Sequence, residues 1–329
     1  MHPVQINHIF SIKTESEFNN LAISIFKHQY QTNGVYKAFV HSLNINTEAI
    51  KDYRHIPFLP IELFKSRDVI CNEKQDDFIV FTSSSTTSQI PSKHIVSDIS
   101  VYEKSFMAGF ELFYGKPSNY VILALLPNYL ERKGSSLVYM FDKLIRHSNK
   151  PEGGFFLDDS EKLISTLDKL KQNNKKTILI GVTYALLDLS DKGIKLNDNF
   201  IVMETGGMKG RREELLKEEL HRELKNKLGV PTIHSEYGMT ELLSQAYSKG
   251  EGVFECPPWM KILIRDIDDP LSFVNENKTG GINVIDLANI NSCSFIATQD
   301  LGRMKNAHQF EIMGRFDNSD VRGCNLMIS

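Results

Sequence analysis

Short apolar runs of strand length alternate with longer segments of helical apolar spacing over much of this sequence. In chain order the expected elements are strand Phe78–Phe81, a helix around 98–114, strand Tyr120–Leu126, helix 134–147, strand Gly154–Leu157, helix 160–173, strand Thr177–Gly181, strand Phe200–Met203, a helix near 210–228 and strand Thr232–Ser235. Parallel strands buried on both faces are apolar throughout, and covering helices connect them. The alternation therefore predicts an α/β fold with layered, mostly parallel sheets and flanking helices.

The sequence before this alternating region has a different character. Residues 1–55 are rich in helix formers with apolar residues at helical spacing, which predicts a helical entry region. The segment His55–Lys65 contains two prolines. Because proline fixes a backbone angle and lacks an amide donor, we expect an extended connector there that leads into the first strand.

After about residue 245 the sequence turns to short β-rich pieces separated by Gly, Asn and Asp. These pieces are Ile262–Arg265, Gly281–Asp286, Ser294–Thr298 and Gln309–Met313. They predict a small C-terminal β subdomain. We therefore expect an α/β core over 1–245, a β-rich subdomain over 246–315 and a tail over 316–329 that carries Cys324.

Charge and composition narrow the class of protein. The formal net charge is −3 and Lys and Arg are spread along the chain, so the basic stripe of a nucleic-acid binder is missing. The sequence has no run of about 18 apolar residues and no signal-peptide pattern at its start, so we expect a cytoplasmic protein without a membrane span. The wide spacing of the cysteines indicates reduced thiols, with neither a zinc site nor a disulfide framework. These cysteines are Cys71, Cys256, Cys293 and Cys324.

A hydroxyl-rich segment, Phe81–Lys93, directly follows a predicted strand. Side-chain hydroxyls and consecutive backbone N–H groups in such a loop can cradle phosphate oxygens, and Lys93 adds a cation. The candidate phosphate contacts are Ser83, Ser84, Thr86 and Thr87. Serine and threonine runs are also common in solvated turns, so this segment alone leaves both interpretations open.

Two further segments follow predicted strands and combine turn residues with polar groups. In Val202–Arg212, Gly206 and Gly207 let a flat ring approach the main chain just before a helix, although glycine pairs also mark plain turns. In His234–Glu241, Thr240 can hydrogen-bond a phosphate and Glu241 can hold Mg²⁺ through hard oxygen ligation. The alternative is that Thr240 and Glu241 simply cap the first turn of a helix.

The last segment with candidate site residues runs from Thr298 to Arg303 and continues with Phe310–Arg315. Asp300 is suited to accept hydrogen bonds from two ribose hydroxyls. Arg315 is suited to bind sugar or phosphate oxygens.

In this order and at these separations, the four segments resemble the core motifs of the adenylate-forming superfamily, above all Tyr237–Glu241 and Asp300–Arg303. From about residue 55 to the end, the chain looks more specifically like the LuxE-type acyl-protein synthetases. The stretches that carry this likeness are His55–Pro60, Lys133–Met140, Glu204–Arg211, His234–Glu241 and Arg322–Cys324.

The resemblance implies that ATP and Mg²⁺ activate a carboxylic acid, expected to be a fatty acid, as an acyl-adenylate. The acyl group then passes to Cys324, from which a partner reductase takes it. A thiolate is a good acyl acceptor, and a segment next to Gly323 can move. The same cysteine can instead pack against the core.

The resemblance also implies a role for each candidate residue. Thr240 and the hydroxyls of Ser83, Ser84, Thr86 and Thr87 would hold phosphates, Glu241 the metal, Gly206 and Gly207 the adenine, Asp300 the ribose, and Arg315 the adenylate. Tyr237 is a candidate for the cofactor site. With Met239 and the 134–141 helix, it is also a candidate for the acyl pocket.

Two departures from the superfamily pattern keep alternatives open. Ser85 and Ser88 stand where relatives carry glycines in the phosphate loop, which favours a non-catalytic scaffold subunit of a reductase complex as one alternative. We also expect the lid domain of relatives to be absent, so Lys93, Lys209, Arg211 or a partner subunit would replace the lid lysine. In a second alternative, coenzyme A or a carrier protein supplies the acceptor thiol.

Overall fold

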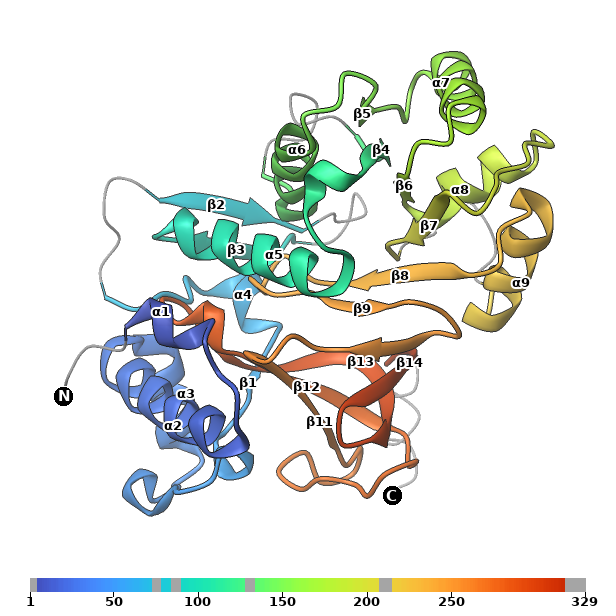
Figure 1. The fold of residues 1–329 in the computed structure, drawn as a ribbon. Helices are drawn as coiled ribbons and strands as arrows, with labels where there is room; N and C mark the ends of the chain where they lie inside the picture. Colours follow the sequence, from blue (N-terminus) through green and yellow to red (C-terminus); the bar gives the residue numbers. More distant parts are fainter. Residues whose placement is uncertain (1–4, 73–77, 84–89, 128–133, 207–214, 317–329) are drawn as a thin grey trace.

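The architecture is built on one large mixed sheet with helices packed around it (Figure 1). The computed structural model describes residues 5–72, 78–83, 90–127, 134–206 and 215–316. Within these ranges the sheet has 12 strands in the order β11-β12-β13-β14-β10-β9-β8-β7-β6-β4-β5, with β1 added beside β13. The predicted α/β class is thereby confirmed.

Parallel strands make up one half of the sheet, and helices pack around it. The strands are β4 (Val121–Leu125), β5 (Gly154–Phe155), β6 (Thr177–Gly181), β7 (Phe200–Glu204) and β8 (Ile233–Tyr237). The helices are α5 (Ile99–Tyr114), α6 (Ser136–Ser148), α7 (Ser160–Gln172), α8 (Thr183–Ser190) and α9 (Lys217–Leu228). Every residue of β4 and β6 is buried, as expected for parallel strands covered on both faces.

The other half of the sheet is antiparallel and joins the parallel half where β9 pairs with β8. Its strands are β9 (Ala246–Ser248), β10 (Val253–Glu255), β11 (Met260–Arg265), β12 (Gly280–Asp286), β13 (Phe295–Asn306) and β14 (Gln309–Arg315). The β-rich character expected after residue 245 is present. The sheet runs unbroken from β8 into β9, and the division into domains stays a prediction.

A separate two-stranded sheet, β2 (Ile79–Thr82) with β3 (Lys93–Val96), lies beside α5. The sequence predicted β2 but not β3, because four residues that include a lysine and a histidine do not form an apolar run. The expected connector contains β1 (Leu59–Pro60) but ends in one helical turn, α4 (Leu63–Ser66), so the expectation of a fully extended segment is wrong there.

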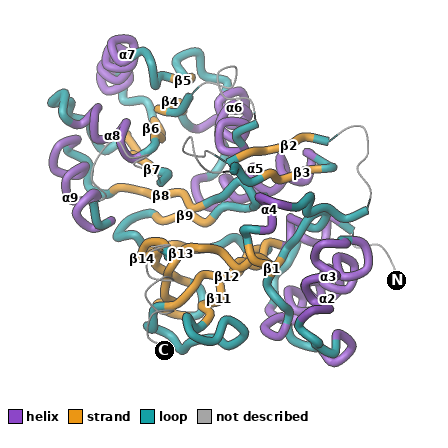
Figure 2. Tube along the Cα trace, turned by 180° about the vertical axis from the view of Figure 1, so that it is seen from behind, coloured by secondary structure: helices purple, strands orange, loops and turns teal. Residues whose placement is uncertain are grey.

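The N-terminal helices are α1 (Ile6–Ile9), α2 (Glu15–Thr32) and α3 (Gly34–Ser42). Of these helices, α2 and α3 pack beside β1 and the antiparallel strands, as two views from opposite sides show (Figures 1 and 2). A capping box begins α2: Glu17 N donates to Thr14 Oγ1 at 3.2 Å, and Thr14 N donates to Glu17 Oε2 at 3.0 Å. Gln29 on the buried face of α2 donates to Ile290 O at 3.0 Å, which ties this helix to the β12–β13 connection.

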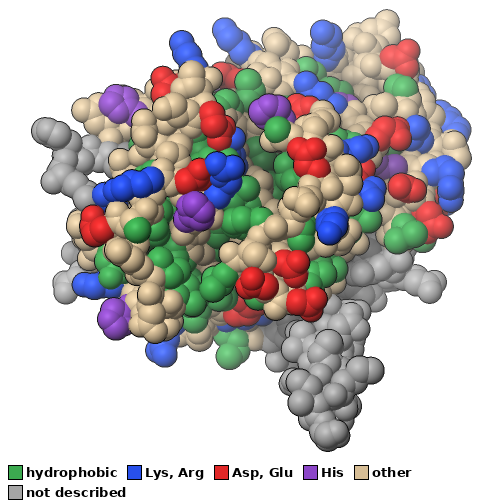
Figure 3. Space-filling view, turned by 90° about the horizontal axis from the view of Figure 1, so that it is seen from below, with side chains coloured by type: hydrophobic (Ala, Val, Ile, Leu, Met, Phe, Trp, Pro, Cys, Tyr) green, Lys and Arg blue, Asp and Glu red, His purple; other side chains and the backbone are tan. Residues whose placement is uncertain are grey.

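The face seen from below carries apolar side chains near its centre (Figure 3). Acidic and basic side chains of both signs are interspersed around them. Among the described residues, no helix is both long and apolar enough to cross a bilayer.

Candidate active site

Three strands bring three predicted site residues together. Tyr237 is the last residue of β8, Asp300 lies within β13, and Arg315 is the last residue of β14, directly opposite Asp300 in the strand register. Tyr237 Oη donates to Asp300 Oδ2 at 2.9 Å, and Arg315 Nε donates to Asp300 Oδ1 at 2.9 Å. Tyr237 and Arg315 therefore share the carboxylate of Asp300, which lies 63 positions after Tyr237 in the sequence.

The Asp300 carboxylate is buried, whereas the Arg315 side chain is 77% exposed. Burial, together with the charge of Asp300, raises the pKa of Tyr237 well above its usual value, so its hydroxyl stays a donor. An ionised carboxylate offers about four lone-pair sites. Asp300 therefore retains capacity for ligand hydroxyls, and the exposed guanidinium of Arg315 can meet an anion beside it.

Glu241 lies in the turn after β8, and its carboxyl is buried. Burial raises its pKa, while a hydrogen bond with Ser92 and the charges of Arg315 and Lys65 act in the opposite direction. The Glu241 carboxyl is thus within electrostatic reach of the Arg315 end of the cluster. Thr240, the preceding residue, is half-buried.

The hydroxyl-rich segment begins and ends on the β2–β3 hairpin. Ser83 N donates to Ser92 O at 3.1 Å, and Ser92 N donates to Ser83 Oγ at 2.9 Å, so this pair closes the base of the loop. Lys93 begins β3 opposite Thr82, with an exposed side chain. The remaining predicted phosphate contacts, Ser84, Thr86 and Thr87, and the departures Ser85 and Ser88 lie outside the described residues.

Gly206 follows β7 and is exposed. A Cβ built on it would meet no atom of the described residues within 4 Å. Two residues before it, Glu204 is buried and forms an ion pair with Lys217 Nζ at 2.7 Å. Gly207, Lys209 and Arg211 lie outside the part of the chain that the structure describes.

The described cysteines are poor nucleophiles. Burial raises the pKa of Cys71 to about 11 and raises the pKa of Cys256 and Cys293 further. Their thiols therefore stay protonated at neutral pH. Cys324 lies outside the described residues, so its predicted role stays a prediction.

Metal binding at this site would depend on a small number of protein ligands. Across residues 5–72, 78–83, 90–127, 134–206 and 215–316, no three His, Cys, Asp or Glu side chains are grouped to hold a metal ion. Glu241 supplies one hard oxygen donor. That donor set suits Mg²⁺, which keeps several waters and uses phosphate oxygens of its nucleotide.

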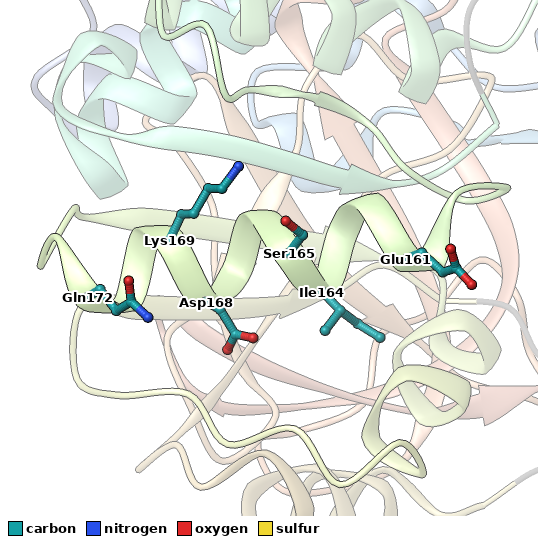
Figure 4. Close-up of a pocket in the computed structure, with 6 residues that line it drawn as sticks. All are labelled: Glu161, Ile164, Ser165, Asp168, Lys169 and Gln172. Carbon is teal, nitrogen blue, oxygen red and sulfur yellow. The ribbon is translucent and has the colours of Figure 1, made fainter.

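A hollow of about 610 Å³ lies elsewhere, along α7 (Figure 4). Its lining residues all come from this one helix, which packs at the β5 edge of the sheet. A ligand site needs groups that converge from several elements. We therefore place the candidate active site at the Tyr237–Asp300–Arg315 cluster and not at α7.

Similar solved structures define the class of fold. A 2-hydroxyisobutyryl-CoA ligase in complex with its acyl-AMP and CoA is 12% identical, with a TM-score of 0.69 over 92% of this chain and 75% of that one. ATP-bound MatB from Rhodopseudomonas palustris is 17% identical, with a TM-score of 0.55 over 74% of this chain and 49% of that one. The fold is that of the adenylate-forming ligases.

Sequence comparisons identify the family. The family model of LuxE, acyl-protein synthetase, matches residues 10–329, and the chain therefore belongs to the LuxE family of acyl-protein synthetases. A long-chain-fatty-acid–luciferin-component ligase of Vibrio harveyi is 21% identical over 340 residues, covering 94% of this chain and 87% of that protein. The family resemblance drawn from the motifs is confirmed, and with it the assignment as an acid–thiol ligase. The individual site residues stay predictions.

Proposed function

We propose that this protein uses ATP to convert a carboxylic acid into an acyl-adenylate and then passes the acyl group to a cysteine thiol. The observation that carries the proposal is the shared Asp300 carboxylate. It is held by Tyr237 and Arg315 at the ends of the strands, with Glu241 within electrostatic reach. Membership of the acyl-protein synthetase family supports the same reaction.

In the first step an oxygen of the substrate carboxylate attacks the α-phosphorus of ATP, and pyrophosphate leaves. In the second step a thiolate sulfur attacks the acyl carbon, a thioester forms and AMP leaves. The protein's contribution to the first step is to hold the reactants in line and to balance negative charge.

Each described side chain has a defined part in this scheme. Asp300 accepts hydrogen bonds from the ribose hydroxyls, Arg315 meets the adenylate phosphate, and the backbone at Gly206 lies against the adenine. Thr240 and Ser83 donate to phosphate oxygens. Lys93, exposed at the start of β3, adds positive charge.

Glu241 would be the protein ligand of Mg²⁺, and phosphate and water oxygens would complete the coordination. When bound, the ion neutralises charge on the phosphates. The buried carboxyl of Glu241, whose charged form is disfavoured by burial, fits a position where a cation arrives with the substrate.

We assign the acceptor role to Cys324 and the substrate class to fatty acids. The Vibrio harveyi relative is named as a ligase of long-chain fatty acids, which supports this substrate. The high pKa values of the described cysteines favour a cysteine outside the described residues as the acceptor. A reductase that takes the acyl group from Cys324 is the partner we propose.

Carboxylate-dependent exchange of labelled pyrophosphate into ATP tests the first step, with short, long and aromatic acids. Exchange that depends on a long-chain acid is expected. No exchange with any acid would favour a non-catalytic scaffold. Intact-mass detection of a thioester, lost in Cys324→Ser, tests the second step, whereas full transfer by that variant to coenzyme A would favour an external acceptor.

A further inference from the structure

Three buried polar side chains hold the backbone of the Thr240–Ser244 turn. Asp286 accepts from Leu243 N at 2.7 Å and from Ser244 N at 2.9 Å. Asn289 Nδ2 donates to Glu241 O at 2.8 Å. His94 Nδ1 lies 2.8 Å from Thr240 O, so successive backbone groups of this turn have side-chain partners.

His94 and Asn289 also contact each other, which joins two distant parts of the chain. His94 Nε2 lies 3.0 Å from Asn289 Oδ1. The amide orientation of Asn289 follows from its surroundings, because its Nδ2 also donates to Cys293 O at 2.9 Å. Both residues are buried: His94 is 0% and Asn289 1% exposed.

The place of His94 in the fold gives this contact its importance. His94 follows Lys93 on β3, the strand that receives the chain from the hydroxyl-rich loop. The β2–β3 sheet is separate from the main sheet. A hydrogen bond from His94 to Thr240 O therefore ties the β2–β3 hairpin to the turn that carries Thr240 and Glu241.

We propose that His94 is a positioning residue that sets the Thr240–Glu241 turn relative to the β2–β3 hairpin for nucleotide binding. It touches no substrate and acts through the backbone of Thr240. The proposal rests on the proposed function of that turn. In such reactions a displacement of about 1 Å costs about 100-fold in rate.

The donor chemistry of His94 guides the choice of variants. Burial lowers the pKa of His94 to about 4, so at neutral pH the ring is neutral and has one N–H. Both ring nitrogens face acceptor oxygens, Thr240 O and Asn289 Oδ1, and the neutral ring donates to one of them. We assign the proton to Nδ1, which faces the Thr240 carbonyl. An asparagine can place an amide N–H close to the position of Nδ1, whereas a leucine cannot donate.

His94→Leu and His94→Asn are compared with Tyr36→Phe as a matched control. Tyr36 is also fully buried and donates to a backbone carbonyl, that of Pro57, at 2.7 Å. Pyrophosphate exchange is measured with MgATP and with the acid as the varied substrate. For His94→Leu we expect the kcat/KM for MgATP to fall about 100-fold. The KM for the acid should change less than about 2-fold.

For His94→Asn we expect the kcat/KM for MgATP to fall only about 10-fold, which is half of the His94→Leu loss on a logarithmic scale. Tyr36→Phe should lower the Tm and leave both KM values unchanged. Equal kinetic behaviour of His94→Leu and Tyr36→Phe would overturn the proposal, because His94 would then contribute stability alone.

Hydrogen exchange of backbone amides in 238–245 separates this inference from the proposed function. Faster exchange in His94→Leu than in Tyr36→Phe supports positioning of the turn, and equal exchange contradicts it. If the wild-type protein exchanged no pyrophosphate with any acid, the proposed function would fail, and the amide measurement would still decide the role of His94.

Discussion

Arg315 and Asp300 face each other across the β13–β14 strand pair, with Arg315 Nε 2.9 Å from Asp300 Oδ1. The carboxylate is buried and the guanidinium is largely exposed, so the pair presents its cation to solvent while its anion stays fixed. A ligand that carries both hydroxyl groups and a phosphate can use both members at once. Nucleotide binding should therefore be sensitive to each of them.

Replacement of Asp300 by asparagine should weaken nucleotide binding with little change in shape. The amide keeps one acceptor oxygen but loses the charge, and hydrogen bonds to charged groups contribute about 1.5–3 kcal/mol. We expect the KM for MgATP in pyrophosphate exchange to rise about 10- to 100-fold.

The control for Asp300→Asn is Glu311→Gln on the same strand pair. Glu311 Oε2 accepts from Arg303 Nε at 2.5 Å, in an ion pair that the site does not use. The KM of the Glu311→Gln variant for MgATP should match that of the wild type. An unchanged KM in Asp300→Asn would remove Asp300 from the nucleotide site.

Replacement of Glu241 by glutamine should separate activity from stability. Burial raises the pKa of Glu241, so the charged form is disfavoured in the folded protein and the neutral amide should not lower the Tm. The exchange rate should fall about 100-fold, equivalent to about 2.7 kcal/mol, with a higher Mg²⁺ requirement. Glu251→Gln, at a side chain that is 82% exposed, is the control and should behave as wild type.

The elements that the sequence predicted well are those whose pattern is local. Apolar runs predicted β4 and β6 closely because all their residues are buried. The strand β3 was missed because its pairing with β2 arises from tertiary structure. The helix α8 was missed because it follows β6 almost directly, without a turn signal between them.

In the candidate site too, local motifs were predicted from the sequence, whereas contacts that depend on tertiary structure were not. Tyr237, Asp300 and Glu241 were found through motifs, but the hydrogen bond between Tyr237 and Asp300 depends on strands that are distant in the sequence. His94, Asp286 and Asn289 had no signal at all. A single polar residue inside an apolar segment becomes informative only when its hydrogen-bond partners are known.

Lys217 should be important for stability because it neutralises a buried charge. Burial alone would raise the pKa of Glu204, but Lys217, His221 and Ser235 hold it at about 2. Lys217→Met removes the closest cation, and breaking a buried pair costs about 3 kcal/mol. Urea unfolding should show this loss, and the double variant Glu204→Gln/Lys217→Met should regain most of it.

Lys227→Met is the surface comparison for Lys217→Met. Lys227 Nζ lies 2.6 Å from Asp191 Oδ1 and 2.6 Å from Glu223 Oε1, on the exposed side of α9. Exposed pairs of this kind contribute less than about 1 kcal/mol. A double variant at Glu204 and Lys217 as unstable as Lys217→Met would contradict the buried-charge explanation.

Glu236 should make the protein less stable as the pH rises towards neutrality. Burial raises the pKa of Glu236 to about 7, although its carboxylate accepts a hydrogen bond from Thr205 Oγ1 at 2.6 Å. Between the unfolded value of 4.5 and about 7, the folded protein keeps a proton that the unfolded chain has lost, so stability falls as pH rises through this window. The full effect is on the order of 3 kcal/mol.

Glu236→Gln removes this titration and keeps an acceptor for Thr205. Urea unfolding at a series of pH values should show the variant and the wild type equally stable near pH 4.5, with the variant increasingly more stable up to about pH 7 and a constant difference above it. Glu255→Gln, at an exposed position on β10, should show no such trend. A constant difference between Glu236→Gln and wild type across the whole range would mean that Glu236 does not titrate in this window.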